Sequence, residues 1–446
     1  MRSLGWALLV FLVSGVSATA EESSGEKSSI FDPDRFEIKP EGHARVYYDS
    51  SANEGIYDRA FISSWALSSS EALNFAAGKL IWGAEPKKQT PLERILRSLG
   101  SAIPLVLLQI PISGASHEYG HFRGYNLAGM KEPQFVSADD RTSYYSDPGV
   151  AFRQIALQSF IPGEFLLAGQ SLEESEKFRK DPKRQRYEAY YHAFIAGDGL
   201  NQEQYNAEMV GLKVLRGKAH PLDAITFFVT SAGTIAYEMD GESDDISLYV
   251  KDLGRAGIKT DVSQVRITSQ IPKLISNSSI SFIVAWFDYW ITGDDAVEPL
   301  ALELGDFRVN WPDFYSYLTL HGPTIKGVER ISWRNYAVNL SYERSLADGS
   351  QEAGVLLEGN VFRWLSVSAE GVRNFTTGGT WAEAEIALRP LALFGEHEAL
   401  RWFELGAKGY YGQGDTFRRE IVGPSLHFEE EKTSGVKWFV GVNIPF

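Results

Sequence analysis

The chain of 446 residues contains no cysteine and only eight histidines. The absence of cysteine excludes a disulfide scaffold, a thiolate metal site, a cysteine nucleophile and a lipid attached to an amino-terminal cysteine. Positive charge is also in short supply, because 43 lysine and arginine residues stand against 58 aspartate and glutamate residues, a formal net charge of −15. This excess of acid argues against a nucleic-acid partner, which would require a basic surface.

The first twenty residues predict a signal peptide. Arg2 supplies a positive charge, and residues 4–16 form an apolar run that is short for a membrane span. Residues 18–20, Ala-Thr-Ala, then offer a cleavage site. We therefore expect export to a bacterial cell envelope, either the outer membrane or the periplasm, with an uncleaved amino-terminal anchor as the alternative. Residues 21–55 are expected to form a polar leader that includes one strand at 43–49.

Residues 56–295 have a mainly helical character. Residues 90–93, Thr-Pro-Leu-Glu, have the pattern of an N-cap, a proline at the first helical position and an acidic first turn. The apolar stretch 102–115 contains two prolines, so that it predicts a buried helix better than a membrane-spanning one. Two later apolar stretches, 224–237 and 280–291, also predict buried helices, with membrane contact as the alternative.

The pattern changes to a period of two in the carboxy-terminal region, 296–446. Apolar and polar residues alternate in 336–343, 365–370 and 403–411, and clusters of Gly, Asp, Ser and Asn separate these segments. Such alternation predicts strands with one apolar and one polar face, about ten of them after residue 302. The predicted fold class is therefore α+β, with a mainly helical unit at 56–295 followed by an antiparallel β-barrel-like region at 296–446.

The last eleven residues, 436–446, alternate most clearly. Their apolar side chains fall on one face: Val436, Trp438, Val440, Val442, Ile444 and Phe446. The length matches the 9–11 residues of a tilted transmembrane strand. A final amphipathic strand that ends on phenylalanine resembles those of bacterial outer-membrane β-barrel proteins, and the resemblance implies a membrane partner and an assembly signal in this strand. A soluble antiparallel sandwich or barrel stays open as the alternative, because its strands alternate as well.

One pair of histidines has the spacing of a metal site, in the segment His117-Glu118-Tyr119-Gly120-His121. On a helix, residues four apart lie on the same face, so both imidazoles can bind one cation while Glu118 sits beside it. Zinc lowers the pKa of bound water to about 7, and a neighbouring glutamate can accept the proton. The alternative is an incidental or inactive pair on a surface helix. The chain shows no Gly-rich phosphate loop, GxSxG elbow or cofactor fingerprint.

This segment resembles HExxH zinc metallopeptidases, and the resemblance implies a zincin-like unit with a Zn²⁺ cofactor. A catalytic zinc takes a third protein ligand. Metzincins are excluded because Leu127 stands where their third histidine would be. In gluzincins a glutamate of a later helix is the ligand; the segment 201–212 resembles that helix, so we expect Glu203 as the metal ligand and Glu208 as the second choice. The site-2-type membrane peptidases share the HExGH form of the segment, and in that resemblance Asp198 would be the ligand.

The leading hypothesis is a zinc-dependent hydrolase, an envelope peptidase in which Glu118 is the catalytic general base and a peptide or protein is the substrate. The main alternative is an outer-membrane β-barrel protein that binds, transports or scaffolds, in which the HExxH segment is incidental or inactive. A soluble periplasmic peptidase with a β-sandwich is a further possibility. Residues 190–192, Tyr-Tyr-His, could polarise a scissile carbonyl, although a role in packing is the stronger expectation.

Overall fold

The structure is a computed structural model that describes residues 43–49, 59–83, 86–129, 134–137, 144–145, 166–169, 172–233, 244–362, 364–390, 403–426, 428 and 430–445. The predicted signal peptide at 1–20 and the predicted leader, apart from its strand, lie outside the described residues. That strand is present as β1 (His43–Asp49). Residues 36–446 form one compact unit, which contains every element described below.

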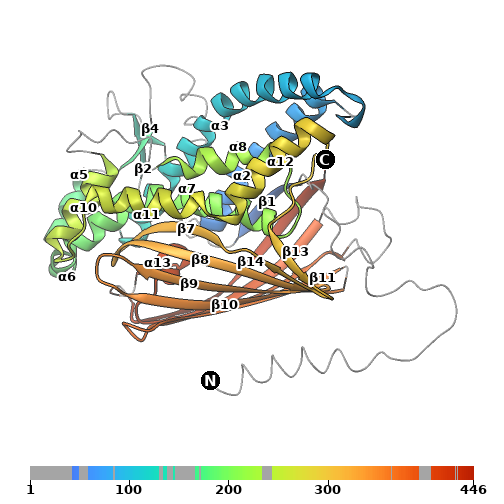
Figure 1. Ribbon diagram of the computed structural model, residues 1–446. Coiled ribbons are helices and arrows are strands. Elements are labelled where there is room, and N and C mark those ends of the chain that lie inside the picture. Colours follow the sequence, from blue (N-terminus) through green and yellow to red (C-terminus); the bar gives the residue numbers. More distant parts are fainter. Residues whose placement is uncertain are drawn as a thin grey trace, which may run out of the picture. The chain divides into compact units, whose positions relative to one another are not determined.

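Helices account for most of the described chain before residue 293 (Figure 1). They are α2 (Arg59–Ala77), α3 (Pro91–Leu127), α5 (Leu172–Lys180), α6 (Pro182–Arg186), α7 (Glu188–Leu215), α8 (Asp223–Ser231), α10 (Asp245–Arg255), α11 (Val262–Leu274) and α12 (Asn277–Thr292), with the short π and 3-10 turns η2 (Gly78–Trp82) and η3 (Pro86–Lys88). A small sheet lies among them, in the order β3 (Tyr144–Tyr145), β2 (Gln134–Ser137), β4 (Leu166–Gly169).

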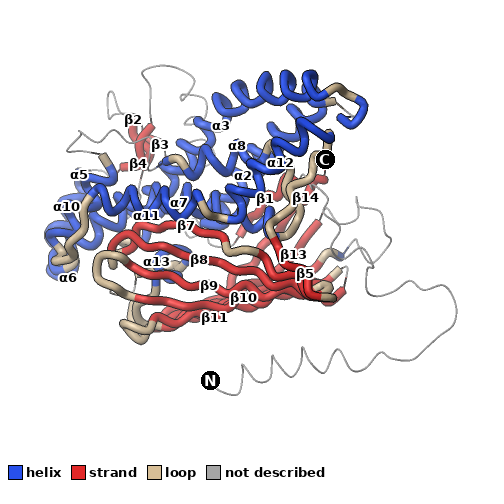
Figure 2. Tube along the Cα trace, in the orientation of Figure 1, coloured by secondary structure: helices blue, strands red, loops and turns tan. Residues whose placement is uncertain are grey.

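Ten strands and one short helix, α13 (Phe417–Val422), follow. The strands are β5 (Ala301–Leu304), β6 (Phe307–Asn310), β7 (Asp313–Thr319), β8 (Gly322–Trp333), β9 (Tyr336–Ser345), β10 (Gln351–Phe362), β11 (Leu365–Asn374), β12 (Thr380–Leu388), β13 (Phe403–Gln413) and β14 (Lys432–Pro445). Together with β1 they form an eleven-stranded antiparallel sheet (Figure 2). The predicted α+β class, with helices first and strands after them, is confirmed.

The sheet is open rather than closed into a barrel within the described residues. Its order runs β1-β14-β13-β12-β11-β10-β9-β8-β6-β5, and β7 pairs with β8 beside β6. Helix α7 lies on the other side of β7. The side chain of Asn201 on this helix donates through Nδ2 to Leu318 O at 2.9 Å and accepts through Oδ1 from Leu318 N at 2.7 Å. One amide side chain thus makes the two bonds that a further strand would make. Helix α2 contacts both α7 and β1, so helices take the place that closing strands would have.

The two faces of the sheet differ in their side chains. Beside apolar residues such as Val372 and Trp381, the buried inner face, which faces α7, carries charged and polar side chains: Lys326, Arg330, Asn339, Glu343, Glu352, Glu404 and Lys437. The outer face exposes large apolar side chains: Leu340, Tyr342, Val355, Ile386, Leu388, Leu405, Val436, Trp438 and Val440. Trp438, for example, is 66% exposed, whereas its neighbour Lys437 is 9% exposed. The alternation predicted from the sequence is therefore present, with its apolar side facing outward.

Helix α3 begins as its sequence predicts and continues without a break through the HExxH segment. Thr90 and Glu93 form a reciprocal capping box, and the helix runs on through Pro104 and Pro111. The prediction that 102–115 is buried holds only for one side of the helix, because Ile103, Leu107 and Ile110 are exposed along the other. Among the described residues α3 is also the one helix long and apolar enough to cross a membrane, a test that core helices pass as well.

Helices and strands share a hydrophobic core. Tyr205 and Val210 of α7 pack with Tyr315 of β7, with Trp381 of β12 and with Ile421 of α13. The change from helix to strand falls between α12 and β5, and the two regions are packed into one unit. This packing holds α7 against the sheet and presents its opposite side to α3.

Candidate metal centre

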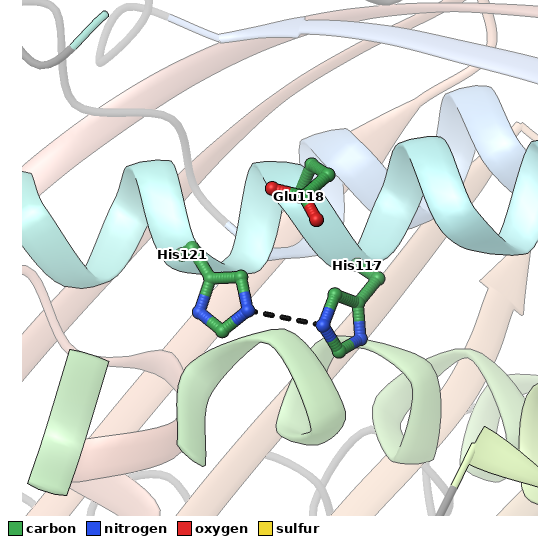
Figure 3. Close-up of side chains that lie close together, drawn as sticks. All are labelled: His117, Glu118 and His121. Atoms are coloured by element: carbon green, nitrogen blue, oxygen red, sulfur yellow. Dashed lines mark hydrogen bonds between the residues drawn. The ribbon is translucent and has the colours of Figure 1, made fainter. Parts of the chain in front are cut away.

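The site forms where α3 crosses α7, and two glycines allow the close approach. A Cβ atom at Gly120 of α3 would collide with the backbone of Asp198 and Gly199. A Cβ atom at Gly199 of α7 would lie 2.6 Å from His121 Nε2 and 2.7 Å from His117 Nε2. Gly120 thus allows α3 to pack closely against α7. Figure 3 shows both imidazoles extending from one side of α3 toward α7.

Three potential ligand atoms converge at this crossing. His117 Nε2 and His121 Nε2 are 3.0 Å apart, and Asp245 Oδ2 lies 2.9 Å from the first and 3.0 Å from the second. Asp245 is the first residue of α10 and comes from a part of the chain 124 residues beyond His121. Ligands of a tetrahedral zinc, bound at 2.0–2.1 Å, lie about 3.3 Å from one another. The donor set and its spacing therefore fit a zinc ion.

The electrostatics of this triad favour a positive charge between the ligands. Burial opposes the charged form of Asp245, but the facing His121 and the hydrogen bonds with both histidines hold its pKa well below the usual range. Burial likewise opposes protonation of His117, yet hydrogen bonds with Asp245 and Glu203 raise its pKa well above the usual value. Two acids thus surround the imidazoles, the environment in which a cation is stabilised.

The Nδ1 atoms of the two histidines contact groups on the side of each ring away from Asp245. His121 Nδ1 lies 2.7 Å from Ile195 O, so this nitrogen carries the proton and Nε2 is left for a metal. His117 Nδ1 lies 3.7 Å from Glu203 Oε1, which also accepts a hydrogen bond from Ser113 Oγ at 3.1 Å. Glu203, the predicted third ligand, is therefore close to the site, but on the side of His117 away from Asp245. There a carboxylate orients the imidazole.

The two other acids considered as ligands are engaged elsewhere. Glu208 points toward the sheet, where its carboxylate pairs with Lys326 at 2.7 Å and accepts a hydrogen bond from Tyr317. Asp198 is fully buried between Arg123, at 2.9 Å, and Arg59. Both carboxylates are neutralised by these cations, and neither is joined to the imidazoles of the HExxH segment by a contact within the described residues.

The aromatic cluster at 190–192 serves in packing. Tyr191 is buried against Phe178 and Phe428. The Tyr190 hydroxyl contacts Ala256 O at 3.4 Å, and His192 lies 3.7 Å from Glu188. These contacts agree with the packing role that was the stronger expectation for this cluster.

Glu118 lies beside the imidazoles on α3, with a carboxylate oxygen within 4.8 Å of a ring nitrogen of each. Its Oε2 accepts a hydrogen bond from Ala168 N of β4 at 2.8 Å, which fixes the carboxylate in place. Burial raises the pKa of Glu118, and the neighbouring His121 and His117 oppose the rise. A buried, oriented carboxylate of this kind can accept a proton at neutral pH.

Sequence reasoning missed Asp245, and the signal available for it was weak. The residue stands in the run Ser243-Asp244-Asp245, and an aspartate at the start of a helix is expected for capping alone. Asp244 does serve as that cap, since its side chain accepts a hydrogen bond from Ser247 N at 2.7 Å. A second acid directly after a capping residue is the one clue that the pattern offers.

No protein-family model matches the chain, and comparisons with curated proteins and with solved structures found no similar protein. The site must therefore be interpreted from its own geometry.

Proposed function

We propose that the protein is a zinc-dependent hydrolase, with His117, His121 and Asp245 as the protein ligands and Glu118 as the general base. The observation that carries this proposal is the convergence of two imidazole nitrogens and one carboxylate oxygen within 3.0 Å of one another, beside a buried glutamate. Three protein ligands and an open fourth position are the arrangement of catalytic zinc sites. A zinc ion bound there would supply a Lewis acid and activate water at neutral pH.

The residues of the chain divide the remaining work. Glu118 accepts the proton of the attacking water and returns it to the leaving group, and the hydrogen bond from Ala168 N keeps its carboxylate oriented. Glu203 and the carbonyl of Ile195 hold the two imidazoles in the tautomer that directs Nε2 toward the metal. The backbone of α7 at Gly199 closes one side of the site.

A peptide is the substrate class that the surroundings of Glu118 favour. Strand β4 lies at the edge of its three-stranded sheet, and the Ala168 N–H on its outer side points to Glu118. Because the Ala168 N–H is already bonded to Glu118, an extended peptide would have to pair with other main-chain groups of this edge, which would bring a peptide bond beside the general base.

The direct test compares Glu118→Gln with the wild type in zinc content and in hydrolysis of a mixed peptide library. We expect Glu118→Gln to keep one zinc per chain and to lose at least a hundredfold in turnover, because it removes the base and leaves the ligands. The double variant His117→Ala/His121→Ala should lose this zinc as well. A wild-type protein that binds no zinc at this site at neutral pH would refute the proposal.

We also propose that the protein resides in the outer membrane, with the outer face of its sheet against lipid. Strands β9 to β14 have nine to fourteen residues, long enough to span a membrane when tilted. The polar inner face and the exposed apolar outer face support this location, since a soluble antiparallel sheet buries its apolar face. A barrel-like protein that binds or transports, with an inactive HExxH segment, remains the second candidate. If His117→Ala/His121→Ala has the same cellular phenotype and the same metal content as the wild type, the binding or transport candidate is favoured.

A further inference from the structure

A second cluster of metal-ligand types lies at one end of the large sheet, among its turns. His321 stands in the turn between β7 and β8, and Asp348 in the turn between β9 and β10. Asp415 lies between β13 and α13, and Glu420 lies on α13 (Figure 1). Residues from four separate places in the chain thus meet at a site that none of the preceding arguments uses.

The imidazole of His321 is held between two carboxylates. Its Nδ1 lies 2.6 Å from Asp348 Oδ2, and its Nε2 lies 2.7 Å from Asp415 Oδ2. Ser350 Oγ donates to the same Asp348 oxygen at 2.9 Å, so the backing carboxylate is itself fixed. A histidine whose one nitrogen is hydrogen-bonded to a carboxylate while the other faces further acids is the arrangement that orients metal-binding histidines.

Glu420 of α13 is the remaining member of the cluster. One ligand atom each of His321, Asp415 and Glu420 lies within 4.8 Å of the other two. The Glu420 side chain is almost fully buried, at 2% exposure, and its Oε2 accepts a hydrogen bond from Leu320 N at 2.8 Å. Its Oε1 is buried without a hydrogen-bond partner among the described residues. An unpartnered buried carboxylate oxygen is costly, which indicates a ligand that the protein chain does not supply.

The charge balance also favours a cation. Three acids, Asp348, Asp415 and Glu420, lie around one imidazole, so that carboxyl groups outnumber the single basic side chain among these ligand-type residues. The guanidinium of the adjacent Arg419 donates to backbone carbonyls, among them Gly414 O at 3.0 Å and Ser425 O at 3.0 Å.

We propose that His321, Asp415 and Glu420 bind a divalent transition-metal ion of the Zn²⁺ or Mn²⁺ type, with Asp348 orienting the imidazole. One imidazole with two carboxylates suits these ions, whereas Ca²⁺ and Mg²⁺ prefer oxygen ligands alone. A pocket of about 300 Å³, lined by His321, Asp348, Asp415 and aromatic side chains that include Tyr190, gives the ion access. Because the ligands come from the β7–β8 turn, from the end of β13 and from α13, the ion would tie these segments together.

The inference does not depend on the proposed hydrolase site, and metal counting separates the two. After removal of metal with EDTA, the full-length chain is titrated with ZnCl₂ and, separately, with MnCl₂ at pH 7.5, by calorimetry for zinc and by electron paramagnetic resonance for manganese. We expect two zinc ions per chain in the wild type and one in His117→Ala/His121→Ala. The ion that remains in this double variant should be lost, or bound at least tenfold more weakly, when Asp415→Asn and Glu420→Gln are added.

The control removes two exposed acids instead, Glu176→Gln with Asp294→Asn, and should leave both ions bound. If the variant with Asp415→Asn and Glu420→Gln does not fold, Asp348→Asn replaces it, with an expected loss of affinity of about 10–100-fold. The inference is overturned if folded His117→Ala/His121→Ala binds neither ion with a Kd below about 100 μM, or if the substitutions at Asp415 and Glu420 leave its binding unchanged. A wild type whose single ion survives in His117→Ala/His121→Ala would instead overturn the hydrolase proposal.

Discussion

At the scale of single residues, the two acids of the candidate zinc site have different proposed roles: one binds the metal, and the other orients a histidine that binds it. Asp245 reaches both Nε2 atoms of the HExxH histidines, whereas Glu203 stands behind His117 at 3.7 Å from its Nδ1. Both carboxylates lie near the same imidazole, Glu203 buried and Asp245 partly exposed, and their positions around the ring separate their roles. A ligand and an orienting residue differ in how much metal affinity each supplies.

Asp245→Asn and Glu203→Gln are therefore expected to weaken zinc binding to different degrees. Asp245→Asn removes a first ligand, so we expect the zinc of this site to be lost at micromolar free zinc. Glu203→Gln should keep the ion with an affinity lowered about 10–100-fold, because it alters only the partner of His117 Nδ1. Competition with a zinc-binding dye measures both affinities. The reverse order, with Glu203→Gln the more damaging change, would make Glu203 the ligand as the sequence predicts.

The sequence could supply part of this site and not the rest. The spacing of His117 and His121 identifies two of the proposed ligands because it depends only on helix periodicity. Asp245 could not be found in this way, since its approach depends on how α10 packs against α3 and α7, which is a tertiary property. Glu203 was chosen on the resemblance to gluzincins, and that reasoning led to the right surroundings, since the residue lies against His117.

A further prediction at this scale concerns Lys273 of α11, which is buried and donates to Ser231 O at 2.9 Å. Burial lowers the pKa of Lys273 to about 7, although the charge of Glu203 opposes the shift. Above pH 7 the unfolded chain keeps this proton up to its ordinary pKa of about 10.4, while the folded chain has lost it. The free energy of unfolding should therefore rise with pH in this window, by at most about 1.4 kcal/mol per pH unit from this group.

Lys273→Met removes that contribution. Urea unfolding at pH 7.5 and pH 9.5 measures the free energy of unfolding. Between these pH values it should rise by about 2 kcal/mol more in the wild type than in Lys273→Met. Lys259→Met, at an exposed position, is the control and should behave as the wild type does. Equal pH dependence in Lys273→Met and the wild type would mean that Lys273 stays protonated in the folded protein.

At the scale of elements, the edge of β7 that faces α7 pairs with a helix side chain and not with another strand. A strand edge within a protein needs partners for its N–H and C=O groups, and Asn201 of α7 supplies both for Leu318. The period of two in the sequence predicts strands at 336–343, 365–370, 403–411 and 436–446, and the described parts of these segments fall in β9, β11, β13 and β14, because the period depends on the local alternation of side chains. It carries no information on closure, which depends on tertiary contacts such as the packing of α7 along β7.

Asn201→Ala is expected to lower the free energy of unfolding by about 2–4 kcal/mol, because it leaves a buried N–H and a buried C=O of Leu318 without partners. Asn201→Asp keeps the acceptor for Leu318 N and loses the donor for Leu318 O, so its effect should be of the same sign. Urea unfolding monitored by tryptophan fluorescence compares the variants. A change below about 0.5 kcal/mol for Asn201→Ala would show that the edge of β7 is satisfied in another way.

At the scale of the whole molecule, the distribution of polarity is the observation on which the proposed membrane location rests. The sequence shows that each strand has one apolar and one polar face, but it cannot show which face is turned outward. In the structure the helices of the α7 layer pack against the polar face, and residues such as Val436 and Trp438 of β14 are left exposed. In water this arrangement would leave a large apolar surface uncovered, whereas in a bilayer it would be matched by lipid.

The substitution of arginine for these two residues tests the membrane proposal directly. In a lipid environment each arginine on the outer face costs about 2–4 kcal/mol near the middle of the bilayer. We therefore expect Val436→Arg/Trp438→Arg to lose most of its recovery in the outer-membrane fraction and its heat-modifiable migration on gels. Glu176→Arg, at an exposed position of α5, adds arginine without touching the sheet and should assemble normally. In a soluble protein both arginines would lie in water at positions already 60% and 66% exposed, so normal folding with improved solubility of the double variant would overturn the membrane assignment.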